Sequence, residues 1–240
     1  MSVASTELVR WLAGIRRQVQ ETNPAFAQLD PVGWPIPFFG DIRTARVLTV
    51  GVNPSSQEFA PPTRWATVTR DAEWVHRLLD YFQGTSPPPN KWFLPWEASL
   101  KLIGCSYEDR TAAHLDLSPR ATIRMTDAPR QRFCDMVQTD VRWFFESLAF
   151  APCARLVLVA GGIIKPEENA WLPIGSYIES RAEHHAARVE SGAGMARIVS
   201  DDGCVSLPMF SFSNGPAAQD KFKLIQDVFV TRKGLLPYLA

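Results

Sequence analysis

The sequence predicts a three-layer α/β/α fold, in which helices cover both faces of a central four-stranded parallel sheet. Two observations support this prediction. Four short apolar runs, rich in Val and Leu, have the length and composition of strands buried on both faces. They lie near residues 47–50, 113–117, 155–160 and 208–213. At least one helical pattern separates each run from the next, as the crossovers of a parallel sheet require.

The helices follow from hydrophobic spacing along the 240 residues. Apolar residues from Leu8 to Val19 recur at helical intervals and predict an opening helix over residues 5–22. The segment 23–40 is rich in Pro and aromatic residues, and we expect an irregular arm there. Further helices are predicted over residues 71–81, 96–104, 131–150 and 217–229, with an amphipathic helix near 178–189.

Length and the continuous α/β pattern predict a single domain over residues 1–240. Residues 1–40 would form the N-terminal helix and arm, and residues 41–240 the sheet core. No apolar stretch reaches the length of a membrane span, and residues 1–14 carry no signal-peptide pattern, so we expect a cytoplasmic protein. A monomer is the expected state.

Charge and cysteine usage exclude several function classes. The 25 basic and 25 acidic residues cancel, so net charge gives no signal for a polyanionic partner such as DNA. The four cysteines form no Cys-x-x-Cys pair, which argues against a zinc knuckle or a disulfide framework. The glycine-rich dinucleotide and nucleoside-triphosphate motifs are missing, and so is the Gly-x-Ser-x-Gly elbow. We therefore expect no metal and no cofactor.

Polar residues gather where the predicted strands end. The first strand runs into Gly51-Val52-Asn53-Pro54-Ser55, the second contains His114 and Asp116, and the fourth runs into Asn214-Gly215. The carboxyl ends of parallel strands share one edge, where open α/β sheets bind ligands. We expect Asn53, Asp116 and Asn214 to line one cavity there. The alternative for the first segment is an ordinary turn, because Asn, Pro and Ser are common turn residues.

This ordered set of strand ends resembles the uracil-DNA glycosylase superfamily over roughly residues 40–230. Gly51-Val52-Asn53-Pro54 is similar to the family's first motif, and Asp116 stands where the family has an Asn that contacts the base. The resemblance implies a hydrolase of DNA repair that cleaves the N-glycosidic bond of a damaged or deaminated base. Asn53 would then position the attacking water, and Asp116 and Asn214 would contact the base.

The remaining candidates complete the expected site. Gly51, Pro54, Ser55, His114 and Gly215 would bind substrate, and an aromatic ring from Phe59 or Trp65 would stack on the base. An ionised Asp116 only accepts hydrogen bonds, so it favours a base that offers an amine or a ring N–H. The loop at 214–218 has no large apolar wedge with which to open duplex DNA.

Two interpretations of His114 and Asp116 remain. Residues two apart on a strand share a face, so the pair is either a general base with its orienting carboxylate or a structural hydrogen bond. Two function classes remain as well: a DNA glycosylase, or a non-catalytic nucleic-acid or nucleobase-binding module on the same fold. A narrow, aromatic-floored slot beside Asn53 favours the glycosylase, whereas a flat or filled edge favours the binding module.

Overall fold

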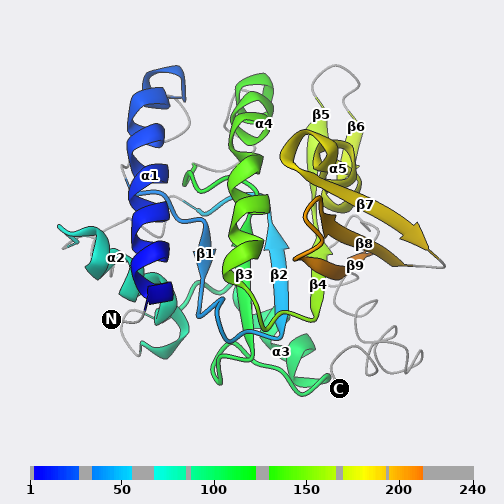
Figure 1. Ribbon diagram of the computed structural model, residues 1–240, viewed down its shortest axis with the longest axis horizontal. Coiled ribbons are helices and arrows are strands. Elements are labelled where there is room, and N and C mark those ends of the chain that lie inside the picture. The colour runs from blue at the N-terminus through cyan, green and yellow to red at the C-terminus, as the bar shows by residue number, and fades with distance from the viewer. Residues whose placement is uncertain are drawn as a thin grey trace.

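The computed structural model describes residues 3–26, 34–55, 68–84, 88–122, 130–165, 170–192 and 195–212. Within these ranges the chain forms an α/β fold around a seven-stranded sheet (Figure 1). In spatial order its strands are β1 (Phe38–Phe39), β3 (Ala112–Asp116), β2 (Val47–Gly51), β4 (Leu156–Ala160), β9 (Ser206–Phe212), β8 (Met195–Ser200) and β7 (Ala187–Gly192). A separate antiparallel hairpin joins β5 (Gly162–Lys165) to β6 (Ala170–Pro173).

Four neighbouring strands of the sheet, β3, β2, β4 and β9, run parallel, which confirms the four predicted strands and their direction. Every residue of β2 is buried, as expected for a strand covered on both faces. The chain passes from β2 to β3 on one side and returns to β4 on the other side. The order of strands therefore reverses at β2, and such a reversal marks the usual ligand site of an open α/β sheet.

The sheet is wider than predicted because β8 and β7 extend it as an antiparallel ribbon beyond β9. The helix predicted near residues 178–189 is wrong over its second half, since α5 spans Ile174–Ala182 and β7 begins at Ala187. Ala186 adopts a left-handed conformation with φ 52°, which ends the helical segment. Beyond it, exposed Arg188 and Glu190 flank the less exposed Val189, and this alternation has the period of a strand.

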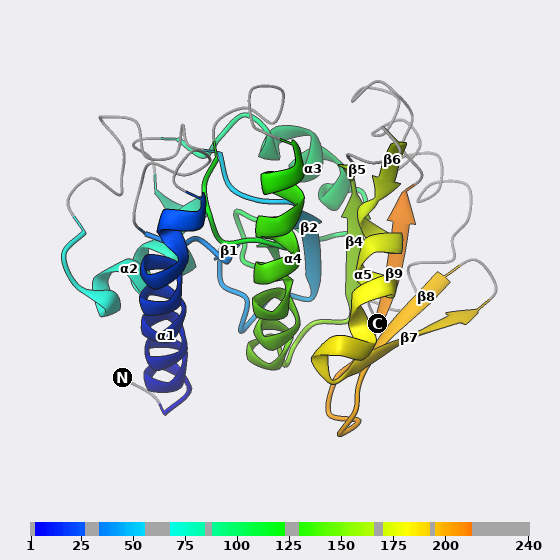
Figure 2. The same cartoon turned by 90° about the horizontal axis from the view of Figure 1, so that it is seen from above.

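Helices lie on both sides of the sheet. Viewed from above, α1 (Val3–Phe26), α4 (Arg130–Ser147) and α5 lie on one side, and α3 (Phe93–Lys101) lies on the other (Figure 2). The short helix α2 (Asp71–Leu79) lies beside α1. The coarse prediction of helices around a mostly parallel sheet is thus confirmed. None of the described helices is both long and apolar enough to cross a membrane.

The start of one helix and the N-terminal arm differ from the predictions. Helix α3 begins three residues before the predicted start, after a turn in which the side-chain oxygen of Asn90 accepts a hydrogen bond from the Trp92 N–H. Within the predicted irregular arm, Phe38 and Phe39 pair with β3 as the antiparallel strand β1. The helix predicted over residues 217–229 lies outside the described residues.

One hydrophobic cluster joins the sheet to the helices of both sides. Leu8, Leu12, Ile15 and Val19 form the buried stripe of α1, as the helical spacing predicts. Burying an aliphatic side chain contributes about 1.5–3 kcal/mol, so this stripe fixes α1 firmly against the rest of the core. The carboxyl edge of β2 and β3 is consequently built on a packed support.

Candidate functional site

The motif after β2 runs alongside the segment that follows β3. Backbone N–H groups of Leu117, Ser118 and Thr122 donate to the carbonyls of Gly51, Val52 and Pro54 at 2.9–3.1 Å. An isolated bridge pairs Ser55 with Thr122 in the same direction. The two strand ends therefore continue as a parallel pair beyond the sheet, and this pairing sets the shape of the edge.

Asn53 locks this pairing with its side-chain amide. Its Nδ2 lies 2.8 Å from the Thr122 hydroxyl oxygen, 3.0 Å from the Arg120 carbonyl and 2.9 Å from the Pro54 carbonyl. Within the described part of the chain, Oδ1 of Asn53 makes no hydrogen bond. The amide plane is thus fixed through its nitrogen, and its oxygen is left to accept a hydrogen bond from a water or ligand.

A buried cation holds the neighbouring segment in place. The Arg120 side chain has no exposed surface and donates to Asp140 at 2.9 Å, to the Val19 carbonyl at 3.2 Å and to the Thr22 hydroxyl. The Ser118 hydroxyl donates to the same Asp140 oxygen at 2.7 Å. These contacts hold the segment after β3 against α4 and α1. The backbone to which the Asn53 amide donates is therefore fixed in position by buried hydrogen bonds.

The predicted pair on β3 is formed. Nε2 of His114 lies 3.3 Å from Oδ1 of Asp116, and both side chains are almost fully buried. On its other nitrogen, Nδ1, His114 contacts the Thr49 hydroxyl at 2.8 Å, and that hydroxyl lies 2.5 Å from the Tyr107 hydroxyl. Four buried side chains thus form one continuous hydrogen-bonded row.

Gly51 allows the row to pass close to β2. Because Gly51 pairs with Asp116 and Thr49 pairs with His114, these residues share one face of the sheet. A Cβ atom on Gly51 would lie 2.7 Å from Oδ1 of Asp116 and 2.9 Å from Nε2 of His114. Any other residue at this position would therefore press directly on the contact between the two side chains.

Burial controls the protonation of this row. Desolvation raises the pKa of Asp116 from the ordinary aspartate value, although the neighbouring His114 opposes the change. Burial also raises the pKa of Tyr107 well above its usual value, so that hydroxyl keeps its proton. Oδ2 of Asp116 is buried and has no hydrogen-bond partner among the described residues. A buried acceptor without a hydrogen-bond donor costs about 1–3 kcal/mol unless a water or a ligand supplies the hydrogen bond.

Aromatic rings surround His114. The rings of Trp92, Phe93 and Phe39 lie 4.9, 5.3 and 6.1 Å from its imidazole, measured between centroids. Trp92 is 48% exposed, which is unusual for so large an apolar side chain. Its indole thus lies between solvent and the buried row, where it could stack on a planar ligand.

The structure places six of the ten predicted site residues at this edge: Gly51, Asn53, Pro54, Ser55, His114 and Asp116. Phe59, Trp65, Asn214 and Gly215 lie outside the described residues. The sequence interpretation missed Thr49, Tyr107 and Trp92. Thr49 carried a usable signal, because it is the one polar residue inside an otherwise apolar strand.

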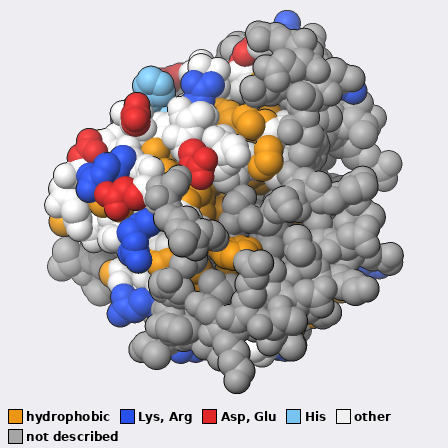
Figure 3. Space-filling view, turned by 90° about the vertical axis from the view of Figure 1, so that its right-hand side faces the viewer, with side chains coloured by type: hydrophobic (Ala, Val, Ile, Leu, Met, Phe, Trp, Pro, Cys, Tyr) orange, Lys and Arg blue, Asp and Glu red, His pale blue; other side chains and the backbone are white. Residues whose placement is uncertain are grey.

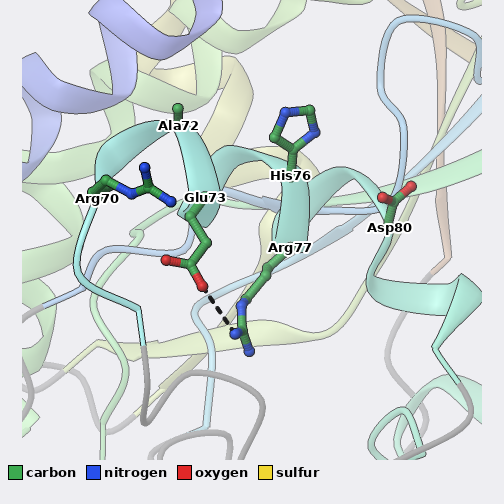
Figure 4. A pocket seen from close by; sticks show the side chains of 6 residues that line it. All are labelled: Arg70, Ala72, Glu73, His76, Arg77 and Asp80. Carbon is green, nitrogen blue, oxygen red and sulfur yellow. Dashed lines mark hydrogen bonds and ion pairs between the residues drawn. The ribbon is translucent and has the colours of Figure 1, made fainter.

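A surface hollow of about 410 Å³ lies elsewhere, along α2 (Figure 4). Its lining includes Arg70, His76 and Asp80, and an ion pair of 3.1 Å joins Glu73 to Arg77. Opposite charges within the lining neutralise each other, and the lining shares no residue with the buried row. We therefore place the candidate site at the carboxyl edge, where an open carboxylate oxygen and a fixed amide occur together.

Metal and charge give no further site. Within the described residues, no three His, Cys, Asp or Glu side chains gather closely enough to hold a metal ion. Among the described side chains on the face in Figure 3, acidic and basic groups mix. On β7, Arg188 and Glu190 form an ion pair of 3.0 Å. No model of a known protein family matches the chain, and the search of curated proteins gave no significant match.

Proposed function

We propose that this protein hydrolyses the N-glycosidic bond of a damaged or deaminated base, in the manner of a DNA glycosylase. One observation carries the proposal: a side-chain amide fixed through its nitrogen and a buried carboxylate with an open oxygen occupy the same strand edge. That edge flanks the point where the strand order reverses, the preferred ligand position of open α/β sheets.

The reaction assigns a role to each group. Oδ1 of Asn53 accepts a hydrogen bond from a water, whose oxygen bonds to the sugar C1′ as the bond from C1′ to the base nitrogen breaks. The bond electrons leave with the base, and the proton lost by the water balances the charge. Asp116 contacts the base edge, and Trp92 provides an aromatic face for stacking, which is worth about 1–3 kcal/mol per base.

The resemblance to the uracil-DNA glycosylase superfamily supports the same assignment. Gly51-Val52-Asn53-Pro54 follows the first strand at the position the resemblance implies, and Asp116 ends the neighbouring strand. DNA is the proposed macromolecular partner and a monomer the proposed state. Since net charge is zero, strong attraction to the phosphate backbone is not expected, and short or single-stranded substrates are the first to test.

The test is an excision assay on single- and double-stranded oligonucleotides that carry uracil, hypoxanthine or xanthine. Asn53→Ala should lower the chemical step by about 10²-fold or more, the scale of a positioned catalytic group. Thr122→Ala is the matched control, because it removes one partner of the Asn53 nitrogen and leaves the Asn53 oxygen in the protein.

Equal losses in the two variants would reduce Asn53 to an anchor of the loop and remove its catalytic role. A wild-type protein that binds nucleobases or oligonucleotides without excising any base would be the non-catalytic binding module. The hydrogen bonds that employ the Asn53 nitrogen in loop structure are the observation that favours this second candidate.

A further inference from the structure

The buried row that ends at Asp116 has a definite direction. Tyr107 keeps its proton, and the Thr49 oxygen at 2.5 Å is the acceptor that the described residues offer to its hydroxyl, so we infer that Tyr107 donates to Thr49. The Thr49 proton then has two acceptors, Nδ1 of His114 at 2.8 Å and the Ala113 carbonyl at 3.4 Å. The Ala113 carbonyl at 3.4 Å is near the limit of a hydrogen bond and Nδ1 is the better-placed acceptor, so we infer that Thr49 donates to Nδ1.

This direction fixes the imidazole of His114. A nitrogen that accepts a hydrogen bond carries no proton, so the ring proton of a neutral His114 resides on Nε2. Nε2 faces Oδ1 of Asp116 at 3.3 Å and donates to it. Both ring nitrogens and one carboxylate oxygen are then engaged, whereas Oδ2 of Asp116 has no hydrogen-bond partner among the described residues and is open to a further proton.

Few charges oppose a proton at Oδ2. In the part of the chain that the structure describes, the titratable groups that act on Asp116 and its row are Tyr107, Glu97 of α3 beyond it, and His114, which opposes the rise that burial causes in the pKa of Asp116. Glu97 is occupied elsewhere, since it accepts hydrogen bonds from the Ser106 hydroxyl and the Tyr107 N–H. Burial of Asp116 favours a neutral carboxyl group.

We propose that His114 is a positioning residue that, oriented by Thr49 and Tyr107, holds its own proton on Nε2 and directs the exchangeable proton of the row to Oδ2 of Asp116. Asp116 then acts as an acid toward a bound heterocycle with a carbonyl oxygen or an unprotonated ring nitrogen at its edge. Oδ2 gives its proton to that atom while the C1′–N bond breaks, and the resulting carboxylate is stabilised by Nε2–H. The proton released by the attacking water restores the acid through solvent.

The acid step rests on the proposed function, but the location of the proton does not. The test is nuclear magnetic resonance of the full chain, labelled at histidine nitrogens and aspartate carboxyl carbons, with His114→Gln to assign the imidazole signals. The Asp116 carboxyl should take up its proton at a higher pH than an ordinary aspartate, and the neutral His114 ring should carry its proton on Nε2. An Asp116 midpoint at or below that of an ordinary aspartate, or a proton on Nδ1 of neutral His114, would overturn the proposal.

Variants of Thr49 separate orientation from packing. Thr49→Val removes the donor to Nδ1 and preserves the shape of the side chain, so the ring proton should no longer be confined to Nε2 and the Asp116 midpoint should shift by about one pH unit or more. Thr49→Ser retains the hydroxyl and should behave as wild type. Should Thr49→Val fail to fold, Tyr107→Phe tests the same row, with a smaller change in the same direction. Unchanged titration in the folded variants would exclude the orienting role of Thr49.

Activity distinguishes this inference from the proposed function. When the protein excises a base, the rate should fall as pH rises through the Asp116 midpoint, and Thr49→Val should displace that limb of the profile. Excision with no such limb refutes the acid step alone. A protein that shows the expected proton positions but no excision on any substrate refutes the glycosylase and leaves the proton location established.

Discussion

Gly51→Ala is the sharpest test of the site, because the added methyl group would meet the contact between His114 and Asp116. The new Cβ would lie 2.7 Å from Oδ1 of Asp116 and 2.9 Å from Nε2 of His114, where ordinary contacts begin at 3.4 Å. To reach an ordinary contact of 3.4 Å with the new methyl group, Oδ1 of Asp116 must move away by 0.7 Å from 2.7 Å, and Nε2 of His114 by 0.5 Å from 2.9 Å. Aromatic rings hold His114 from several sides, so neither atom can yield freely.

The expected loss of stability combines three effects. Overpacking a core costs about 1–3 kcal/mol, and a lost hydrogen bond to a charged group costs about 1.5–3 kcal/mol. Reduced freedom of the unfolded chain returns about 0.4–1 kcal/mol when Gly becomes Ala. Because overlapping effects do not add fully, we expect the free energy of unfolding to fall by about 2–4 kcal/mol.

Urea denaturation followed by tryptophan fluorescence measures this loss. Gly14→Ala is the matched control, because no atom lies within 4 Å of its added Cβ and the residue sits inside α1. That variant should gain about 0.5–1 kcal/mol from its higher helix propensity. A Gly51→Ala protein as stable as wild type, with the contact between His114 and Asp116 intact, would show that the close approach at Gly51 does not exist.

Three further predictions concern single side chains. Asp116→Asn should stabilise the protein increasingly as pH rises. Because the pKa of Asp116 is raised, the folded state holds a proton that the unfolded chain releases, so wild-type stability falls as pH rises between the unfolded and folded pKa values. Urea denaturation at about pH 4 and pH 8 would show this difference. In a calorimetric titration, Trp92→Ala should weaken nucleobase binding by about 1–3 kcal/mol. Leu94→Ala, which changes a nearby exposed residue on α3, should leave binding unchanged, and equal losses in the two variants would contradict stacking on Trp92. Asp140→Ala should lower the free energy of unfolding by about 3–5 kcal/mol, because it removes the buried carboxylate that pairs with Arg120. Asp80→Ala, at the exposed ion pair with Arg110, should cost about 0–1 kcal/mol. Similar losses in the two variants would refute a special contribution of the buried pair between Arg120 and Asp140.

Local hydrophobic pattern in the sequence was enough to predict the parallel strands of the core, but not the antiparallel strands at the edges of the sheet. The strands at β2, β3, β4 and β9 are apolar runs buried on both faces, so composition alone marks them. β1 has only two residues, too few for any period, and β7 follows a helix so closely that its alternation was hidden in a helical stretch. Antiparallel edges of this kind become visible only once their pairing partners are known.

The site likewise contains residues that local sequence pattern reveals and residues whose roles depend on distant partners. Gly51, Asn53 and Asp116 could be predicted because each stands at the end of a recognisable strand. The roles of Thr49 and Tyr107 could not, although Thr49 stands out as a polar residue in an apolar strand. These roles depend on the register that pairs Thr49 with His114 and on the hydrogen bond between Thr49 and Tyr107. The amide of Asn53 is likewise held by groups 67 and 69 residues away, a relationship that no local window contains.

Arg120 makes the candidate site dependent on the N-terminal helix. Its guanidinium reaches the Val19 carbonyl and the Thr22 hydroxyl across sequence separations of 101 and 98 residues. Closing loops of this length costs conformational entropy, which the contacts must offset. The segment that Asn53 grips is therefore completed only when α1 docks. Deleting or locally unfolding α1 would disable the edge from a distance, with every residue of the site still in the chain.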